Sequence, residues 1–307
     1  MSLQLFFLNP IIRFSMKRRF RKKPHVMELR AIMSEIAKRP AKIPPRITKT
    51  EASLGGVRTE VFKDAKADET RALLYLHGGG WVAGTPSNHI PLLWRLADQT
   101  NVPVYAPDYR LAPEHPFPAG LDDCVGVYRA LLDNGIAASS IVVGGDSAGG
   151  NLTLALALKL KQLGLPQPAG LVCLSPATEL AEPLPSHSSN RNSDAMFDSR
   201  IFATVREVYW PNQDGTNPLI SPLRGDVRGL PPTLFQASAA EMLRDDSVYM
   251  AEKMRAAGVP VTIDLWPRVF HVWQVTADIL PEARVAIHRI ARFVKERLAA
   301  SAQKAAA

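Results

Sequence analysis

The stretch from Val142 to Asn151, which reads Val-Val-Gly-Gly-Asp-Ser-Ala-Gly-Gly-Asn, constrains the fold of this chain more than any other. Its β-branched start predicts a strand, and the apolar spacing after Asn151 predicts a helix. Between them lies a Gly-x-Ser-x-Gly turn, in which flanking glycines allow Ser147 a strained backbone conformation. Ser147 is therefore the candidate nucleophile, and the backbone N–H of Ala148 lies at a helix N-terminus that favours developing negative charge.

Strands and helices alternate through most of the remaining chain. Helices are expected at 88–100 and 122–134, after Ser147, and from residues 247 and 281 onward. They separate the expected strands, which are 57–62, 71–76, 102–106, 141–143, 169–175, 233–238 and 261–266. Because helices of this length imply right-handed crossovers, the pattern predicts an α/β fold with a mostly parallel sheet flanked by helices.

Two segments interrupt this alternation. Residues 1–50 contain two expected helices, 3–14 and 24–36, before the first strand. A proline-rich stretch at about 180–228 surrounds one apolar helix and is too long for a plain connection. We therefore expect an N-terminal helical cap segment at 1–50, and a main domain at 51–307 with a cap insertion at about 180–228.

The formal net charge of +8 is concentrated at one end of the chain. Residues 1–23 hold seven Lys and Arg residues and no acid, so 8 − 7 leaves the remainder near neutral. The body has no basic groove interleaved with aromatic residues, so no nucleic-acid partner is expected, whereas the basic tail permits contact with an anionic membrane surface. The apolar segment 3–14 precedes the basic run, the reverse of a signal peptide, and is shorter than the roughly 20 residues that span a bilayer. Two interpretations stay open: a segment lying over an apolar pocket or on a membrane, and a terminal helix with a solvated basic side.

The two cysteines indicate the compartment. Cys124 and Cys173 lie in apolar segments and are interpreted as small buried hydrophobes, which favours a reducing environment. We expect a cytoplasmic protein, with peripheral binding at the inner membrane surface as an option. No metal is expected, because no partner His, Cys or acid lies at ligand spacing from His77.

The expected strand at 71–76 leads directly into His77, Gly78, Gly79 and Gly80. Three consecutive glycines let the backbone approach a substrate oxygen, so two of their N–H groups can join that of Ala148 in an oxyanion hole. The sequence does not decide which two, although Gly79 is preferred. His77 is expected to hold this loop by hydrogen bonds.

A serine nucleophile needs a general base and a carboxylate behind that base. His271 follows a strand and a short loop at the carboxyl edge of the expected sheet, whereas His288 lies within the last helix. Three acids follow the preceding expected strand, 233–238. Glu241 comes soonest after that strand and is favoured, whereas Asp245 and Asp246 resemble residues at a helix N-terminus.

Three motifs in series carry a family resemblance. They read His-Gly-Gly-Gly-Trp from residue 77, Asp-Tyr-Arg-Leu-Ala-Pro-Glu-His-Pro-Phe-Pro-Ala from residue 108, and Gly-Asp-Ser-Ala-Gly-Gly from residue 145. Over residues 55–295 the chain resembles the hormone-sensitive-lipase-like esterases, the bacterial family IV carboxylesterases. The resemblance implies an α/β-hydrolase fold with eight strands and a helical cap, and hydrolysis of short- to medium-chain esters without cofactor. It also implies a triad of Ser147, an acid and His271, and pairing of subunits as a homodimer through the eighth strand or the last helix.

The sequence departs from the family at one place that matters. Where the family usually shows Asp-x-Leu-x-Asp, this chain reads Glu-Met-Leu-Arg-Asp from residue 241, so Glu241 occupies the position of the catalytic acid. Glutamate is an accepted triad acid on this fold, and the chain is similar to a sub-branch that carries it. In the middle motif, Arg110 and Glu114 are expected to form a structural ion pair.

These features predict a carboxylesterase that hydrolyses small esters through an acyl-enzyme on Ser147. An apolar substrate pocket has candidate lining residues at Trp81, Phe197, Phe202, Val269, Phe270, Val272 and Trp273. Two alternatives stay open. The same fold includes small-molecule binding proteins that do not hydrolyse, although these lack the triad histidine, and a lactonase or deacetylase would use the same triad.

Overall fold

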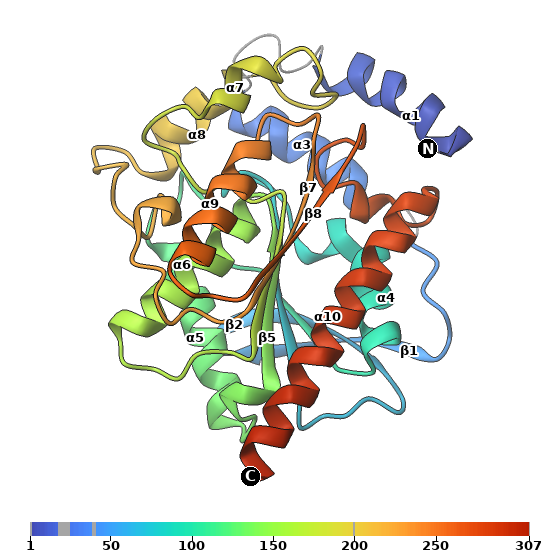
Figure 1. Cartoon of the computed structure of the whole chain (residues 1–307). Coiled ribbons are helices and arrows are strands. Elements are labelled where there is room, and N and C mark those ends of the chain that lie inside the picture. The colour runs from blue at the N-terminus through green and yellow to red at the C-terminus, as the bar shows by residue number, and fades with distance from the viewer. Residues whose placement is uncertain (1, 18–24, 39–40, 199, 307) are drawn as a thin grey trace.

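The computed structural model describes residues 2–17, 25–38, 41–198 and 200–306. A single eight-stranded sheet runs through its centre (Figure 1), in the order β1-β2-β4-β3-β5-β6-β7-β8. Strand β2 is antiparallel to both of its neighbours and all other pairs are parallel. The strands are β1 (Ile47–Leu54), β2 (Val57–Asp64), β3 (Ala72–Leu76), β4 (Val104–Pro107), β5 (Ile141–Asp146), β6 (Gly170–Leu174), β7 (Thr233–Ser238) and β8 (Val261–Trp266).

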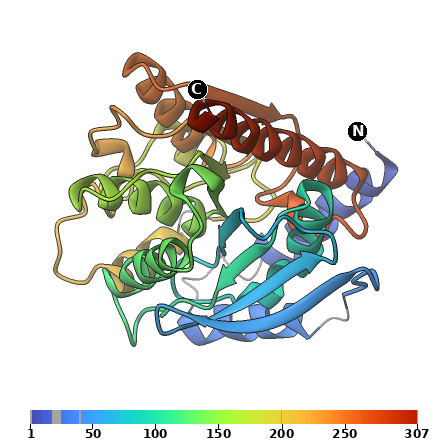
Figure 2. The ribbon, with the colours of Figure 1, turned by 90° about the horizontal axis from the view of Figure 1, so that it is seen from below.

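Helices cover both faces of the sheet (Figures 1 and 2). Helices α5 (Ala119–Asp133), α6 (Ala148–Gln162) and α9 (Arg244–Ala256) pack on one face, and α4 (Ile90–Thr100) and α10 (Pro281–Ala306) pack on the other. Every residue of β3, β5, β6 and β7 is buried, as expected for parallel strands covered on two sides. The structure therefore confirms the predicted α/β fold.

Strand β1 is the one strand that the residue pattern did not predict. It pairs along its whole length with β2, so the sheet begins at Ile47. Its sequence, Ile-Thr-Lys-Thr-Glu-Ala-Ser-Leu, is mostly polar, and only its first and last residues are buried. A polar, charged edge strand gives no run of apolar residues, and such an edge discourages pairing with other chains.

Four helices gather at one end of the molecule, at the top of Figure 1: α1 (Leu3–Ile12), α3 (Val26–Ala37), α7 (Pro185–Ser189) and α8 (Arg200–Tyr209). Shorter turns of helix are Arg13–Lys17 (π), Pro86–His89, Ala138–Ser140, Pro222–Arg224 and Trp273–Thr276 (3₁₀). These four helices come from the two segments that interrupt the strand and helix alternation. None of the helices in the described ranges combines the length and the apolar character needed to cross a membrane.

Helix α3 is fastened to the body by an arginine. The guanidinium of Arg30 pairs with Glu114, with 2.7 Å between Nη1 and Oε1, and also donates to the backbone carbonyls of Val82 and Ala112. Arg110 pairs instead with Asp123. The predicted Arg110–Glu114 ion pair is therefore wrong, because each residue meets an opposite charge on a different helix.

The start of α6 depends on a missing side chain, and this gives a stability prediction. A Cβ atom added at Gly149 would lie 1.9 Å from the Leu76 carbonyl oxygen, whereas one added at Gly126 in α5 would meet nothing closer than 3.5 Å. We expect Gly149→Ala to lower the free energy of unfolding by about 3 kcal/mol or more, because the backbone of β3 must move. Gly126→Ala is the matched control and should leave stability unchanged or raise it by about 0.5–1 kcal/mol. Urea denaturation measures both, and equal midpoints would contradict the close contact.

Candidate active site

Ser147 lies on the corner between β5 and α6. Its φ of 53° and ψ of −117° place it in a backbone conformation that residues other than glycine rarely adopt. Its N–H donates to the Leu174 carbonyl at 2.8 Å, which holds the corner against the end of β6. A Cβ at Gly145 would lie 2.4 Å from the Gly149 carbonyl oxygen, so both flanking glycines are required. The corner carries the hydroxyl into the wall of a large cavity.

His271 and Glu241 lie together on the same edge of the sheet. His271 Nδ1 and Glu241 Oε2 are 2.6 Å apart, and both side chains are buried. The other oxygen of Glu241 accepts hydrogen bonds from Ser175 Oγ at 2.8 Å and from the Ser238 N–H at 2.7 Å. Because the carboxylate faces Nδ1, the proton of a neutral imidazole belongs on Nδ1, which leaves Nε2 as an acceptor. That Nε2 is buried without a hydrogen-bond partner among the described residues, and His271 lines the same cavity as Ser147.

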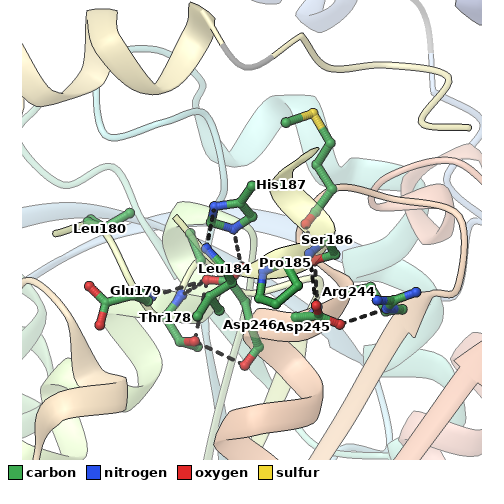
Figure 3. Close-up of polar contacts among 12 residues, drawn as sticks. Thr178, Glu179, Leu180, Leu184, Pro185, Ser186, His187, Arg244, Asp245 and Asp246 are labelled. Atoms are coloured by element: carbon green, nitrogen blue, oxygen red, sulfur yellow. Dashed lines mark hydrogen bonds and ion pairs between the residues drawn. The ribbon is translucent and has the colours of Figure 1, made fainter. Parts of the chain in front are cut away.

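Asp245 and Asp246 have other partners, as Figure 3 shows. Asp246 accepts the Thr178 N–H at 2.6 Å and lies 2.6 Å from Nε2 of His187. Asp245 accepts the Ser186 N–H at 2.8 Å. Both aspartates therefore hold the segment around α7 onto the start of α9, and Glu241 alone of the three acids contacts His271.

The glycine loop after β3 holds three candidate oxyanion-hole donors, and two of them have a backbone N–H group without an acceptor in the described residues. The N–H of Gly78 donates to Asp146 Oδ1 at 3.0 Å, so it is not available to a substrate. The prediction that Gly78 is an oxyanion-hole donor is therefore wrong. Gly79 and Gly80 have φ of 132° and 66°, and no acceptor in the described part of the chain pairs with their N–H groups or with that of Ala148.

Asp146 is a functional candidate that the sequence analysis missed. Its Oδ1 accepts hydrogen bonds from Tyr75 Oη at 2.9 Å, from Gly78 and from His89 Nε2 at 3.0 Å. Both ring nitrogens of His89 act as donors, since Nδ1 faces the Thr85 carbonyl at 3.3 Å. A donor at each nitrogen is the pattern of an imidazolium. Asp146 stands inside the serine motif, but nothing in the pattern pointed to His89, which lies 57 positions earlier.

His89 and Asp146 each shift the pKa of the other in the direction that favours its charged form. Burial acts to lower the pKa of His89, but the Asp146 carboxylate and the hydrogen bonds raise it above its ordinary value. Burial acts to raise the pKa of Asp146, and His89 and Tyr75 bring it below its ordinary value. Burial lowers the pKa of His77 to about 4, so His77 is neutral; its Nδ1 donates to the Gly78 carbonyl at 2.8 Å, and its ring stacks on Tyr109. His77 thus holds the loop by hydrogen bonding, as predicted.

The cavity has a volume of about 610 Å³ and a mostly apolar wall. Ser147 and His271 lie in this wall, together with four predicted pocket residues, Trp81, Phe197, Phe202 and Val272. Val269, Phe270 and Trp273 do not reach it, because they are buried in the core beneath α10. The N-terminal segment supplies Met16, Leu29, Met33 and Ile36. Within the described residues, no three His, Cys, Asp or Glu side chains form a group that could hold a metal ion.

Comparisons with known proteins place this geometry in a family. A family model described as an alpha/beta hydrolase fold matches residues 73–275. An acetyl-hydrolase from Streptomyces hygroscopicus is 38% identical over 243 residues, which cover 79% of this chain and 81% of that protein. Esterase LipU from Mycobacterium tuberculosis is 40% identical over 237 residues, covering 75% and 80%. A crystal structure of an esterase from the bacterial hormone-sensitive lipase family superimposes with a TM-score of 0.90 at 34% identity, covering 97% of this chain and 99% of that one. The chain therefore belongs to the α/β-hydrolase family, among the esterases of the hormone-sensitive lipase type.

Proposed function

We propose that the chain is a carboxylic ester hydrolase that forms an acyl-enzyme on Ser147 with short- to medium-chain esters. The observation that carries this proposal is the buried Glu241–His271 pair: His271 Nε2 has no partner among the described residues, and His271 lines the same cavity as Ser147. Relatives named esterase and acetyl-hydrolase support the same reaction class.

In this mechanism His271 Nε2 accepts the proton of the Ser147 hydroxyl as Oγ attacks the ester carbonyl. The Glu241 carboxylate stabilises the imidazolium that forms. The N–H groups of Gly79, Gly80 and Ala148 bind the oxyanion of the tetrahedral intermediate. His271 then protonates the leaving alcohol, and water repeats the sequence on the acyl-enzyme to release the acid and the free serine.

Asp146 acts in this mechanism as a positioning residue. Its backbone directly precedes Ser147, and its carboxylate holds the N–H of Gly78 at the start of the glycine loop. It thereby sets the separation between the nucleophile and the oxyanion donors. His89 supplies a positive charge that keeps this carboxylate ionised inside the protein.

The two cap segments, 1–50 and about 180–228, act as a lid over the cavity in this proposal. The pocket wall supports that role, because it draws side chains from α3 and from α8. The seven basic residues within 1–23 favour contact with an anionic membrane surface on the cytoplasmic side. Strand β8 pairs only with β7 in the described sheet, and its free edge, or α10, is the proposed surface of a homodimer.

Labelling of the serine tests the proposed function. A fluorophosphonate probe should label the purified protein and fail to label Ser147→Ala. p-Nitrophenyl butyrate should be turned over by the unlabelled parent protein, and neither by Ser147→Ala nor by the parent after labelling. A panel of aryl esters, lactones and N-acetyl compounds separates an esterase from a lactonase or a deacetylase. Tight binding of ligands with no turnover and no labelling would instead indicate a small-molecule binding protein.

Glu241→Gln should lower kcat by about 10³–10⁴-fold, because the imidazole loses the charge that stabilises its protonated form. The matched variant is Asp245→Asn, which removes a carboxylate four residues away that contacts Ser186 and Arg244 and does not contact His271. It should change kcat by only a few-fold. Steady-state kinetics at pH 8 decide between the two acids, and the opposite ranking would assign the role to Asp245.

The His89–Asp146 pair gives a pH-dependent stability prediction. Because the folded-state pKa of His89 is raised, its contribution is fully present below about pH 6.5 and is lost as the pH rises through that raised pKa. The lowered pKa of Asp146 keeps its contribution above about pH 4, and it is lost as the pH falls through that lowered pKa. We expect His89→Gln to reduce the free energy of unfolding by about 2–3 kcal/mol at pH 5–6 and by less at pH 9. Chemical denaturation of this variant, with the exposed His288→Gln as control, measures the difference; a value that does not change from pH 5 to 9 would contradict it.

The proposed lid leads to a prediction about the acyl-chain length of the preferred substrates. Met33 of α3 lines the cavity, so Met33→Trp should fill part of the apolar space. We expect kcat/KM for p-nitrophenyl octanoate to fall by about tenfold or more relative to the acetate, by loss of apolar burial. The profile across acetate, butyrate, hexanoate and octanoate measures this effect. An unchanged profile would mean that acyl chains do not reach α3.

A further inference from the structure

Helix α1 exposes a row of large apolar side chains. Eleven large hydrophobic side chains are exposed in the described structure, and five of them lie within residues 3–14: Leu3 (76% exposed), Phe6 (59%), Phe7 (64%), Ile11 (61%) and Phe14 (70%). The rings of Phe6 and Phe7 contact each other edge to face at 5.4 Å. Isolated exposed apolar residues are ordinary on a soluble protein, but a contiguous group of this size marks an interaction surface.

The opposite side of α1 is firmly attached to the body, so the exposure does not come from a detached helix. Leu5 is buried, with 1% exposed. The N–H and hydroxyl of Ser2 both donate to the Glu282 carboxylate, at 2.6 and 2.7 Å, and Asn9 Nδ2 donates to the Arg268 carbonyl at 2.6 Å. The helix is apolar on both sides and buries only one of them.

The charge next to this face identifies its partner. The chain has no acid before Glu28, and Arg13 and Lys17 follow α1 directly. Five more basic residues, Arg18, Arg19, Arg21, Lys22 and Lys23, continue the run in the sequence, outside the described ranges. Apolar residues beside clustered positive charge match a bilayer that contains anionic lipids, where insertion and electrostatic attraction act together. A second copy of the chain fits less well, because each copy carries the same seven positive charges and no acid within residues 1–23.

We propose that the exposed face of α1 (Leu3, Phe6, Phe7 and Ile11), together with Phe14 in the π turn that follows it, docks on an anionic lipid bilayer and places the cavity beside lipid esters. This inference rests on the proposed function for its substrate, and on α1 alone for the docking. Helix α1 lies over the segment that leads from β8 to His271, since Asn9 bonds to Arg268 three residues before it. The turn that follows α1 carries Met16 into the cavity wall. A docked α1 therefore brings the bilayer next to the lid, where acyl chains of lipids can enter.

The test measures binding without turnover. The full chain carrying Ser147→Ala is sedimented with vesicles of phosphatidylcholine and phosphatidylglycerol at equal amounts, and with vesicles of phosphatidylcholine alone. We expect binding to the anionic vesicles, and binding at least about tenfold weaker for Phe6→Ser/Phe7→Ser/Ile11→Ser, because these side chains lose their apolar burial. The matched control is Leu163→Ser/Tyr249→Ser, which removes exposed apolar side chains at the end of α6 and on α9 and should bind as the parent does.

Activity on soluble p-nitrophenyl acetate, measured with Ser147 restored, checks that the α1 variant is folded, because none of its three residues lines the cavity. Equal vesicle binding by the α1 variant and its parent would overturn the proposal. So would an absence of binding by the parent, or a dimer in sedimentation velocity that the α1 substitutions dissociate while vesicles stay unbound. Because vesicle binding is measured on the Ser147→Ala variant, failure of docking and failure of the esterase assignment are separate results.

Discussion

The contact between Gly149 and the end of β3 is the constraint on which the site depends. Helix α6 begins so close to the Leu76 carbonyl that a single methyl group would not fit. The glycine loop begins at the next residue, His77, so the same contact sets the separation of the Ser147 corner from the loop. Ser147 and the glycine loop are therefore placed relative to each other by the packing of one helix on one strand.

Three imidazoles lie against carboxylates around the cavity: His89 against Asp146, His187 against Asp246, and His271 against Glu241. They differ in what the second nitrogen meets. In His89 it faces the Thr85 carbonyl, and in His187 it accepts the Leu184 N–H. Only His271 of the three keeps a nitrogen without a partner among the described residues. The same pair of groups thus holds the loop at Thr85, holds the segment around α7, and in the proposed mechanism accepts a proton.

The helices at the top of the sheet connect the cavity wall to the surface of the molecule. His187 is held by Asp246 and stacks on Phe202 at 5.0 Å, so an acid on α9 fixes part of the pocket wall. On the other side, Arg30 fastens α3, which supplies Met33 to the same wall. Helix α1 continues this N-terminal layer outward and ends it in exposed apolar side chains. These segments, the proposed lid, are therefore bonded to the body by charged groups and line the cavity with apolar ones, and by our proposal the exposed face of α1 meets the bilayer.

The sequence by itself determined the features that depend on neighbouring residues. Strand and helix periodicity, the glycines around Ser147 and after β3, and the positions of Glu241 and His271 behind strands all follow from local backbone preferences and apolar spacing. Tertiary structure decided the partners of charged groups far apart in the chain. Asp146 accepts a hydrogen bond from Gly78, 68 positions away, and Arg110 forms an ion pair with Asp123 and not with Glu114. It also decided that polar β1 joins the sheet and that α1 leaves one apolar face uncovered, because burial depends on which surfaces the folded chain brings together.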